Sequence, residues 1–238
     1  MADVNRPKAV ALISGSNRGI GAAIASELIE HGYAVSLGAR RTDELEAAHG
    51  PEDDSRMHAE FDAFRPETAK RWVDMTADRF GRIDALINNA GSAERVRLDE
   101  DNEEALDRLW TVNVTAPLRL VRLCLPHLER CGRGRIVNIA SLSGKRVRNS
   151  FVGYNMTKFA MMGLTHTVRH ATWDSGIRAT AICPGFVNTR MSSYTDKVKP
   201  DEMIQPETLA TLVRTTIELP NTAAVAELLV NCRREDMV

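Results

Sequence analysis

The chain has 238 residues, of which 43% are hydrophobic. This length suits one large α/β domain that covers both faces of a sheet, whereas two independent domains would be cramped. Its 31 Lys and Arg residues nearly balance its 32 Asp and Glu residues, so no long-range field of one sign attracts nucleic acid or an anionic membrane.

Short β-branched apolar runs alternate along the chain with longer segments of helical period. This alternation predicts a parallel sheet with crossover helices, in a single doubly wound α/β domain over residues 1–238. The seven expected strands are Ala9–Ser14, Ala34–Ala39, Met57–Phe61, Ile83–Asn88, Arg135–Ala140, Ile177–Cys183 and Val225–Asn231. The expected helices lie near Ile20–His31, Pro66–Phe80, Asn102–Arg130, Tyr154–Trp173 and Pro206–Glu218.

Three glycines lie where the first expected strand turns into the first expected helix, between Ser14 and Gly21. Free N–H groups and the helix dipole favour an anion there, and the absence of Cβ atoms lets a pyrophosphate approach, as in Rossmann-like folds. Glycines also occur in ordinary strand-to-helix turns, so the position of this turn after the first strand matters more than its pattern. The cofactor-binding residues expected here are Gly15, Ser16, Asn17, Arg18, Gly19, Ile20 and Gly21.

The second expected strand ends at Ala39, and Arg40 and Arg41 follow. Enzymes that use NAD normally place an acid at this strand end, where it binds the adenosine ribose. A guanidinium instead binds a 2′-phosphate through charge-assisted hydrogen bonds, and Arg18 could reach the same phosphate. The sequence therefore predicts that Arg40 gives NADP(H) preference over NAD(H), although solvated loop charges would produce the same pattern.

Tyr154 and Lys158 are four residues apart in an expected helix, so their side chains lie on one face. An unperturbed phenol titrates near pH 10, and a nearby ammonium lowers its pKa toward the range useful for acid/base catalysis. Lys158 could also hold the nicotinamide ribose. Such pairs also arise by chance in helices, so the pair needs support from other residues.

Two upstream polar residues are candidates for that support. Ser141 follows the expected strand Arg135–Ala140, and its hydroxyl could donate to a substrate oxygen as charge develops. Asn113 lies in an otherwise apolar helical stretch, where it could position a water that relays protons to Lys158.

Taken together, these motifs resemble the short-chain dehydrogenase/reductase family in order and spacing over nearly the whole chain. The matching pieces are Ser14-Gly15-x-x-x-Gly19-x-Gly21, Asp62-Ala63, Asn88-Asn89-Ala90-Gly91, Asn113, Ser141, Tyr154-x-x-x-Lys158 and Pro184-Gly185-x-x-x-Thr189. The chain lacks the glycine-rich tail that many family members carry after the last strand.

The resemblance implies catalytic roles for Asn113, Ser141, Tyr154 and Lys158, with Tyr154 as the acid/base. It also implies that Asp62 and Ala63 lie near the adenine, that Asn89, Ala90 and Gly91 lie along the ribose, and that the segment with Pro184, Gly185, Val187 and Thr189 surrounds the carboxamide. It further implies a homodimer or homotetramer. The activity it implies is hydride transfer between NADP(H) and a ketone or secondary alcohol.

Other functions remain open. A non-redox lyase or dehalogenase, or a non-catalytic NADP(H)-binding sensor, could share this scaffold, although the intact Ser141, Tyr154 and Lys158 disfavour both. His166 and His170 are also four residues apart, but no third zinc ligand is evident.

The substrate itself does not follow from the sequence. Its pocket is expected to be built from residues 93–98, residues 142–151 and a polar loop over residues 188–205. Several cations in the first two segments are compatible with an anionic substrate and equally with solvated charge.

The N-terminal residues lack the apolar segment of a secretory signal, and no run approaches the roughly 18 apolar residues that span a bilayer. The four cysteines have no zinc-like spacing. We therefore expect a cytoplasmic protein whose partner is a small molecule, with no metal, nucleic-acid or membrane partner.

Overall fold

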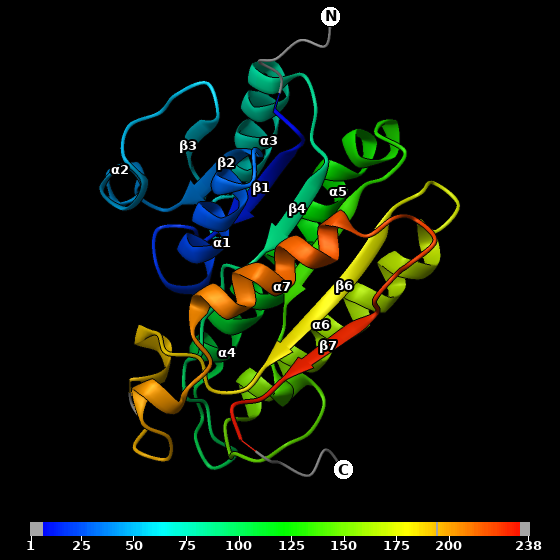
Figure 1. Cartoon of the computed structure of the whole chain (residues 1–238). Helices are drawn as coiled ribbons and strands as arrows, with labels where there is room; N and C mark the ends of the chain where they lie inside the picture. The colour runs from blue at the N-terminus through cyan, green and yellow to red at the C-terminus, as the bar shows by residue number, and fades with distance from the viewer. Residues whose placement is uncertain (1–6, 194, 234–238) are drawn as a thin grey trace, which may run out of the picture.

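The computed structural model describes residues 7–193 and 195–233. Within them, seven parallel strands form one sheet in the order β3-β2-β1-β4-β5-β6-β7 (Figure 1). From β1 to β7 the strands are Val10–Ser14, Ala34–Ala39, Arg56–Glu60, Ala85–Asn88, Arg135–Ile139, Arg178–Pro184 and Glu227–Val230. From α1 to α7 the helices are Gly19–Glu30, Thr42–His49, Pro66–Phe80, Glu103–Trp110, Ala116–Arg130, Val152–Ala171 and Pro206–Glu218.

Helices cover both faces of the sheet, so its central strands are buried on both sides. Strands β1, β4 and β5 are buried at every residue, as expected for apolar strands in a parallel sheet. Helices α1 and α7 pack together on one face, and α3 and α5 pack on the other with α6 (Figure 1). Leu28 and Val213 belong to the first core, whereas Trp72 and Leu120 belong to the second.

The predicted doubly wound α/β fold and its seven strands are confirmed, with strand ends shifted by at most two residues. Two helical features differ from the prediction. The segment expected as one helix over Asn102–Arg130 contains a π-helical turn, Thr111–Thr115, between α4 and α5. Helix α2 was not predicted because Leu45 is its only buried residue, which leaves no apolar period to detect.

The strand order reverses between β1 and β4, and the turns after both strands lie at the carboxyl edge of the sheet. Ligands of open α/β sheets bind at this kind of switch point. The polar loop after β6 lies at the same edge (Figure 1). Its two ends are joined by the pairing of Val187 with Ile204, and it contains 3-10 turns at Arg190–Ser192 and Pro200–Glu202.

None of the helices in the described part of the chain has the length and apolar character needed to cross a membrane.

Candidate active site

The turn between β1 and α1 has the backbone geometry of an anion-binding loop. Gly15 and Gly19 have φ angles of 68° and 56°, in the left-handed region that favours glycine. Helix α1 has no side-chain cap at Arg18 and no acidic residue in its first turn. Its first N–H groups and the positive end of its dipole are therefore available to an anion such as a pyrophosphate.

Asn89, just after β4, holds this turn in place across the switch point. Its Nδ2 donates to O of Ser14 at 2.9 Å and to O of Gly15 at 3.0 Å. The Ser14 hydroxyl accepts from the amides of Asn89 and Ala90, both at 3.0 Å. A Cβ on Gly21 would lie 2.3 Å from O of Gly15 and 2.4 Å from Nδ2 of Asn89. Only glycine permits this close approach.

Helix α2 contacts the residues between the glycines. Nε2 of His49 lies 2.8 Å from O of Ser16, and Nδ2 of Asn17 donates to Oε2 of Glu44 at 2.6 Å. Oγ of Ser16 is buried and has no hydrogen-bond partner among the described residues. Helix α2 therefore braces the turn, and a buried hydroxyl is left without a protein partner beside it.

The two arginines after β2 differ in their contacts. Arg41 donates to the carboxylate of Asp43 from Nη2 at 2.6 Å and from Nε at 3.1 Å. This hydrogen bonding raises the pKa of Arg41 and lowers the pKa of Asp43. Arg40 and Arg18 are exposed, and no described residue forms an ion pair with either. Arg40 is therefore the guanidinium left available at this strand end.

Helix α6 carries Tyr154 and Lys158 one turn apart, as expected. The Lys158 ammonium lies 5.6 Å from the centroid of the Tyr154 ring. Its Nζ donates to O of Ile139, at the end of β5, at 3.0 Å. Burial lowers the pKa of Lys158 to about 8.

Asn113 lies in the π-helical turn, and both the nitrogen and the oxygen of its side-chain amide form hydrogen bonds. Its Nδ2 donates to O of Ser92 at 2.9 Å and to Oγ1 of Thr157 at 3.1 Å, and its Oδ1 accepts from N of Ser92 at 2.8 Å. A Cβ on Gly91 would lie 3.4 Å from Oδ1 of Asn113 and 3.9 Å from Nζ of Lys158. The Asn113 amide and the Lys158 ammonium therefore both lie close to Gly91. The water expected to relay protons to Lys158 stays a prediction.

Ser141 lies just beyond β5 and caps the 3-10 turn Leu142–Gly144. Its Oγ accepts from N of Ser143 at 3.1 Å, so its O–H remains able to donate to a substrate. A Cβ on Gly144 would lie 2.6 Å from O of Lys158. The turn that carries Ser141 is therefore packed directly against α6 at Lys158.

The residues expected near the adenine lie after β3. Oδ1 of Asp62 accepts from N of Phe64 at 3.0 Å, and O of Ala63 accepts from Nη1 of Arg119 at 3.2 Å. These contacts fix the loop that would border the adenine.

The segment Pro184–Thr189 joins the turn that carries Ser141 to the glycine turn. A Cβ on Gly185 would lie 3.3 Å from Cδ1 of Leu142, next to Ser141. A Cβ on Gly19 would lie 3.3 Å from Cγ2 of Thr189. The segment therefore lies between the positions expected for the pyrophosphate and for the reacting groups.

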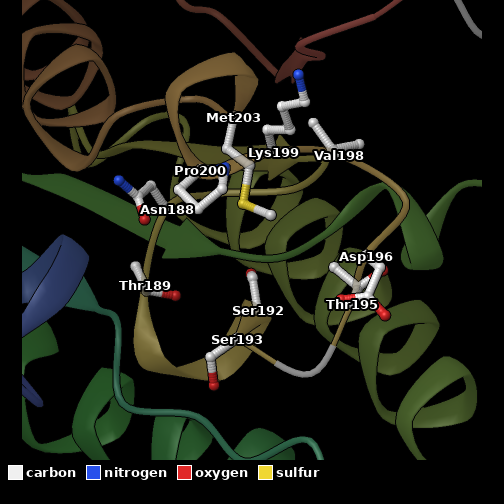
Figure 2. Close-up of a pocket in the computed structure, with 10 residues that line it drawn as sticks. All are labelled: Asn188, Thr189, Ser192, Ser193, Thr195, Asp196, Val198, Lys199, Pro200 and Met203. Carbon is white, nitrogen blue, oxygen red and sulfur yellow. The ribbon is translucent and has the colours of Figure 1, made fainter.

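A cavity of about 410 Å³ opens beside this segment, within the loop after β6 (Figure 2). This volume is in the range of small-molecule sites. Figure 2 shows Thr189, Ser192 and Ser193 on one side of it and Met203 and Pro200 on another. The described residues that line the cavity all belong to the expected loop over residues 188–205, and none comes from residues 93–98 or 142–151, the other two segments expected to build the pocket.

The residues present fit a dinucleotide. The uncapped start of α1, the glycines that admit no Cβ and the unpartnered Ser16 hydroxyl match the needs of bound phosphates.

The comparison with known families decides the identity of this arrangement. Residues 9–199 match the family model described as short chain dehydrogenase. The chain belongs to the short-chain dehydrogenase family. The resemblance predicted from the motifs is confirmed.

Similar proteins include agropine synthesis reductase of Rhizobium rhizogenes, which is 53% identical over 96% of this short-chain dehydrogenase. The chain spans about half of that relative, 53% of its length. The alcohol dehydrogenase of Thermococcus sibiricus, in complex with 5-hydroxy-NADP, has a TM-score of 0.85 at 30% identity and covers 96% of this chain and 99% of its own. Gluconate 5-dehydrogenase of Burkholderia cenocepacia J2315, in complex with NADP and tartrate, has a TM-score of 0.83 at 25% identity. The match covers 95% of this chain and 94% of that protein.

Sequence reasoning missed the residues that position this dehydrogenase's site through long-range contacts. His49 and Glu44 brace the glycine turn, and Ser92 and Thr157 hold Asn113. His49 and Ser16 are 33 residues apart, and no local pattern signals that contact. Thr157 lies inside the Tyr154-x-x-x-Lys158 motif and could have been found there.

The buried Lys158 predicts a pH-dependent stability for the cofactor-free dehydrogenase. Its pKa falls from 10.5 to about 8 on folding, so the unfolded chain binds more protons between these pH values and stability rises as pH increases through 8. We expect the Lys158→Met variant, which lacks this titrating group, not to show this rise of stability with pH. Measured by urea unfolding, the stability of the wild type relative to the variant should rise by about 1 kcal/mol from pH 7 to pH 9.

The buried thiols have little effect on the stability difference between the wild type and Lys158→Met. Burial raises the pKa of Cys124 to about 12 and of Cys183 to about 11, which lowers stability above pH 9 in both proteins, so most of this effect cancels in the difference. A difference that stays constant over this pH range would show that Lys158 is not desolvated in the folded protein.

Proposed function

We propose that the chain is an NADP(H)-dependent oxidoreductase that transfers a hydride between the nicotinamide and a ketone or secondary alcohol. The observation that carries the proposal is the buried Lys158 ammonium, 5.6 Å from the Tyr154 ring centroid and packed against the turn of Ser141. A bound nicotinamide supplies the hydride donor or acceptor at C4.

In this proposal Tyr154 protonates the substrate oxygen during reduction and takes the proton back during oxidation. Lys158 holds a positive charge beside the phenol, which favours the phenolate. The Ser141 hydroxyl donates to the same substrate oxygen, where negative charge develops. Asn113 holds the Ser92 backbone and the Thr157 hydroxyl, and Thr157 in turn donates to O of Tyr154 at 2.9 Å. Asn113 therefore positions the catalytic turn of α6.

A screen of NADPH oxidation tests the activity. The panel contains acyl-thioester ketones, open-chain sugars, steroids and small diketones, with absorbance of NADPH and chromatography of the products as the two readouts. Turnover of a ketone supports the proposal. NADPH binding with no turnover of any carbonyl would instead favour the sensor, and turnover that leaves NADPH unchanged would favour a lyase or dehalogenase.

The preference for NADP(H) is proposed to depend on Arg40, with Arg18 on the opposite side of the 2′-phosphate. Arg40→Ala should weaken NADPH binding about ten- to a hundredfold, the worth of one charge-assisted hydrogen bond, and leave NADH binding unchanged. Arg41→Ala is the matched control, because Asp43 already holds that guanidinium, and it should have a smaller effect. Fluorescence titration with each nucleotide measures both affinities.

Equal losses of NADPH and NADH affinity in Arg40→Ala would refute this assignment, since only NADPH carries the 2′-phosphate. If only Arg41→Ala loses NADPH affinity, Arg41 binds the 2′-phosphate instead of Arg40. Its ion pair with Asp43 would then have to break when NADPH binds.

We also propose that the protein assembles as a homodimer or homotetramer through α4, α5 and α6. Large apolar side chains on these helices are exposed, namely Trp110 at the end of α4 and Met156 and Phe159 on α6. Exposed apolar residues grouped on neighbouring helices are typical of interfaces between subunits.

A further inference from the structure

We propose that the cavity in the loop after β6 is a subsite for an acyclic, polyhydroxylated chain, so that the substrate is a sugar-derived carbonyl compound or the corresponding polyol. This inference rests on the proposed function and adds the substrate class to it. Of the described residues that line the cavity, seven are polar, and those with amide or hydroxyl groups are Asn188, Thr189, Ser192, Ser193 and Thr195 (Figure 2).

The lining has hydrogen-bonding capacity that the protein itself does not use. Oγ of Ser192 has no hydrogen-bond partner among the described residues, although the residue is half-buried. Oγ of Ser193 donates to O of Arg190 at 2.9 Å and keeps its lone pairs for a ligand. Nδ2 of Asn188 donates to Oε1 of Gln205 at 3.0 Å, which leaves the Asn188 oxygen to accept. A hydroxylated chain both donates and accepts, so it can satisfy all three groups.

An apolar substrate would fit this lining poorly. A steroid or aliphatic acyl chain would displace water from these hydroxyls without returning hydrogen bonds, and covering a polar group in this way weakens binding. Among the described residues that line the cavity, the apolar ones are Val198, Pro200 and Met203. They offer a surface for the C–H groups of a short chain.

The charges of the cavity balance. Asp196 and Lys199 both line it, and neither forms an ion pair with another described residue. A carboxylate accepts from hydroxyl groups and an ammonium donates to them, so both can bind the same uncharged chain. This balance favours a neutral polyol chain in the subsite over an anionic group.

The cavity lies next to the glycine turn, and the segment Pro184–Thr189 links it to the turn of Ser141, since a Cβ on Gly185 would lie 3.3 Å from Cδ1 of Leu142. Thr189 borders both the cavity and Gly19 of the glycine turn. The amide of Asn188 donates to O of Ile204 at 2.9 Å, and N of Ile204 donates to O of Phe186 at 3.0 Å. These two bonds tie the base of the loop.

The experiment compares NADP⁺ reduction with acyclic polyols and with monoalcohols of equal chain length. The polyols are erythritol, xylitol, mannitol and glucitol, and the monoalcohols are the linear secondary alcohols from butan-2-ol to hexan-2-ol. We expect kcat/KM for at least one polyol to exceed that of its monoalcohol by tenfold or more. Ser192→Ala should lower polyol kcat/KM by about two- to tenfold, the worth of one hydrogen bond, and leave monoalcohol turnover unchanged.

Ser175→Ala is the matched control, because Ser175 is exposed and its hydroxyl contacts Glu129, away from the cavity. Monoalcohols that react as well as polyols, or a Ser192→Ala variant that affects both classes equally, would overturn the subsite. So would a protein that reduces the general substrate 9,10-phenanthrenequinone with NADPH but oxidises no polyol. Failure to bind NADPH or to reduce any carbonyl is a separate result, which would overturn the proposed function together with this inference.

Discussion

Tyr154→Phe is expected to lower kcat by about 10²- to 10⁴-fold, the usual contribution of a general acid or base. The substitution removes one oxygen and keeps the ring, so the contact between the Lys158 ammonium and the Tyr154 ring, at 5.6 Å from its centroid, can persist. NADPH affinity should therefore change by less than about twofold. Steady-state kinetics on the best substrate of the carbonyl screen, together with fluorescence titration of NADPH, measure the two quantities.

Tyr33→Phe provides the matched control for this change. Tyr33 is a buried tyrosine, and burial raises its pKa to about 12. It lies in the core beside α1, away from Ser141 and Lys158, so its loss of a phenol oxygen should leave kcat unchanged. Turnover that survives in Tyr154→Phe would remove the phenol from the mechanism. Joint loss of turnover and NADPH binding would assign Tyr154 a structural role instead.

The fold could be predicted from the sequence because its signals are local. Apolar strands such as Val10–Ser14 and Ala85–Asn88 are buried on both faces and read as continuous runs, and Gly32 and Gly81 end helices with φ angles of 80° and 72°. The i, i+4 spacing of Tyr154 and Lys158 places them together on any helix. These features need only a few neighbouring residues to be recognised.

The rest depends on contacts between distant segments. The π-helical turn around Asn113 belongs to a segment whose apolar pattern continues through it, so no helix boundary was visible. Helix α2 is largely exposed, and its contacts with the glycine turn arise only when β1 and β2 pair. Pairing, packing and side-chain direction decide these details, and none of them is encoded within one short window.

Gly21→Ala is expected to be among the most damaging single substitutions in the chain. A Cβ there would lie 2.3 Å from O of Gly15 and 2.4 Å from Nδ2 of Asn89, distances that require the backbone of the turn to move. Overpacking of this kind lowers the free energy of unfolding by about 1–3 kcal/mol. Because the same turn would bind the pyrophosphate, NADPH affinity should fall by at least about tenfold. Thermal unfolding and NADPH titration of the purified variant measure both losses.

Gly163→Ala separates this effect from the general cost of adding a methyl group. Gly163 lies within α6, and a Cβ there would meet no atom within 4 Å. Alanine is favoured over glycine inside a helix by about 1 kcal/mol, so this variant should be more stable than the wild type and should bind NADPH equally well. If Gly21→Ala is less stable than the wild type and Gly163→Ala is more stable, the requirement for glycine at position 21 comes from its close approach to Asn89. A Gly21→Ala protein with wild-type stability and NADPH affinity would show that the turn can relax, and the anion site would then have to be placed elsewhere.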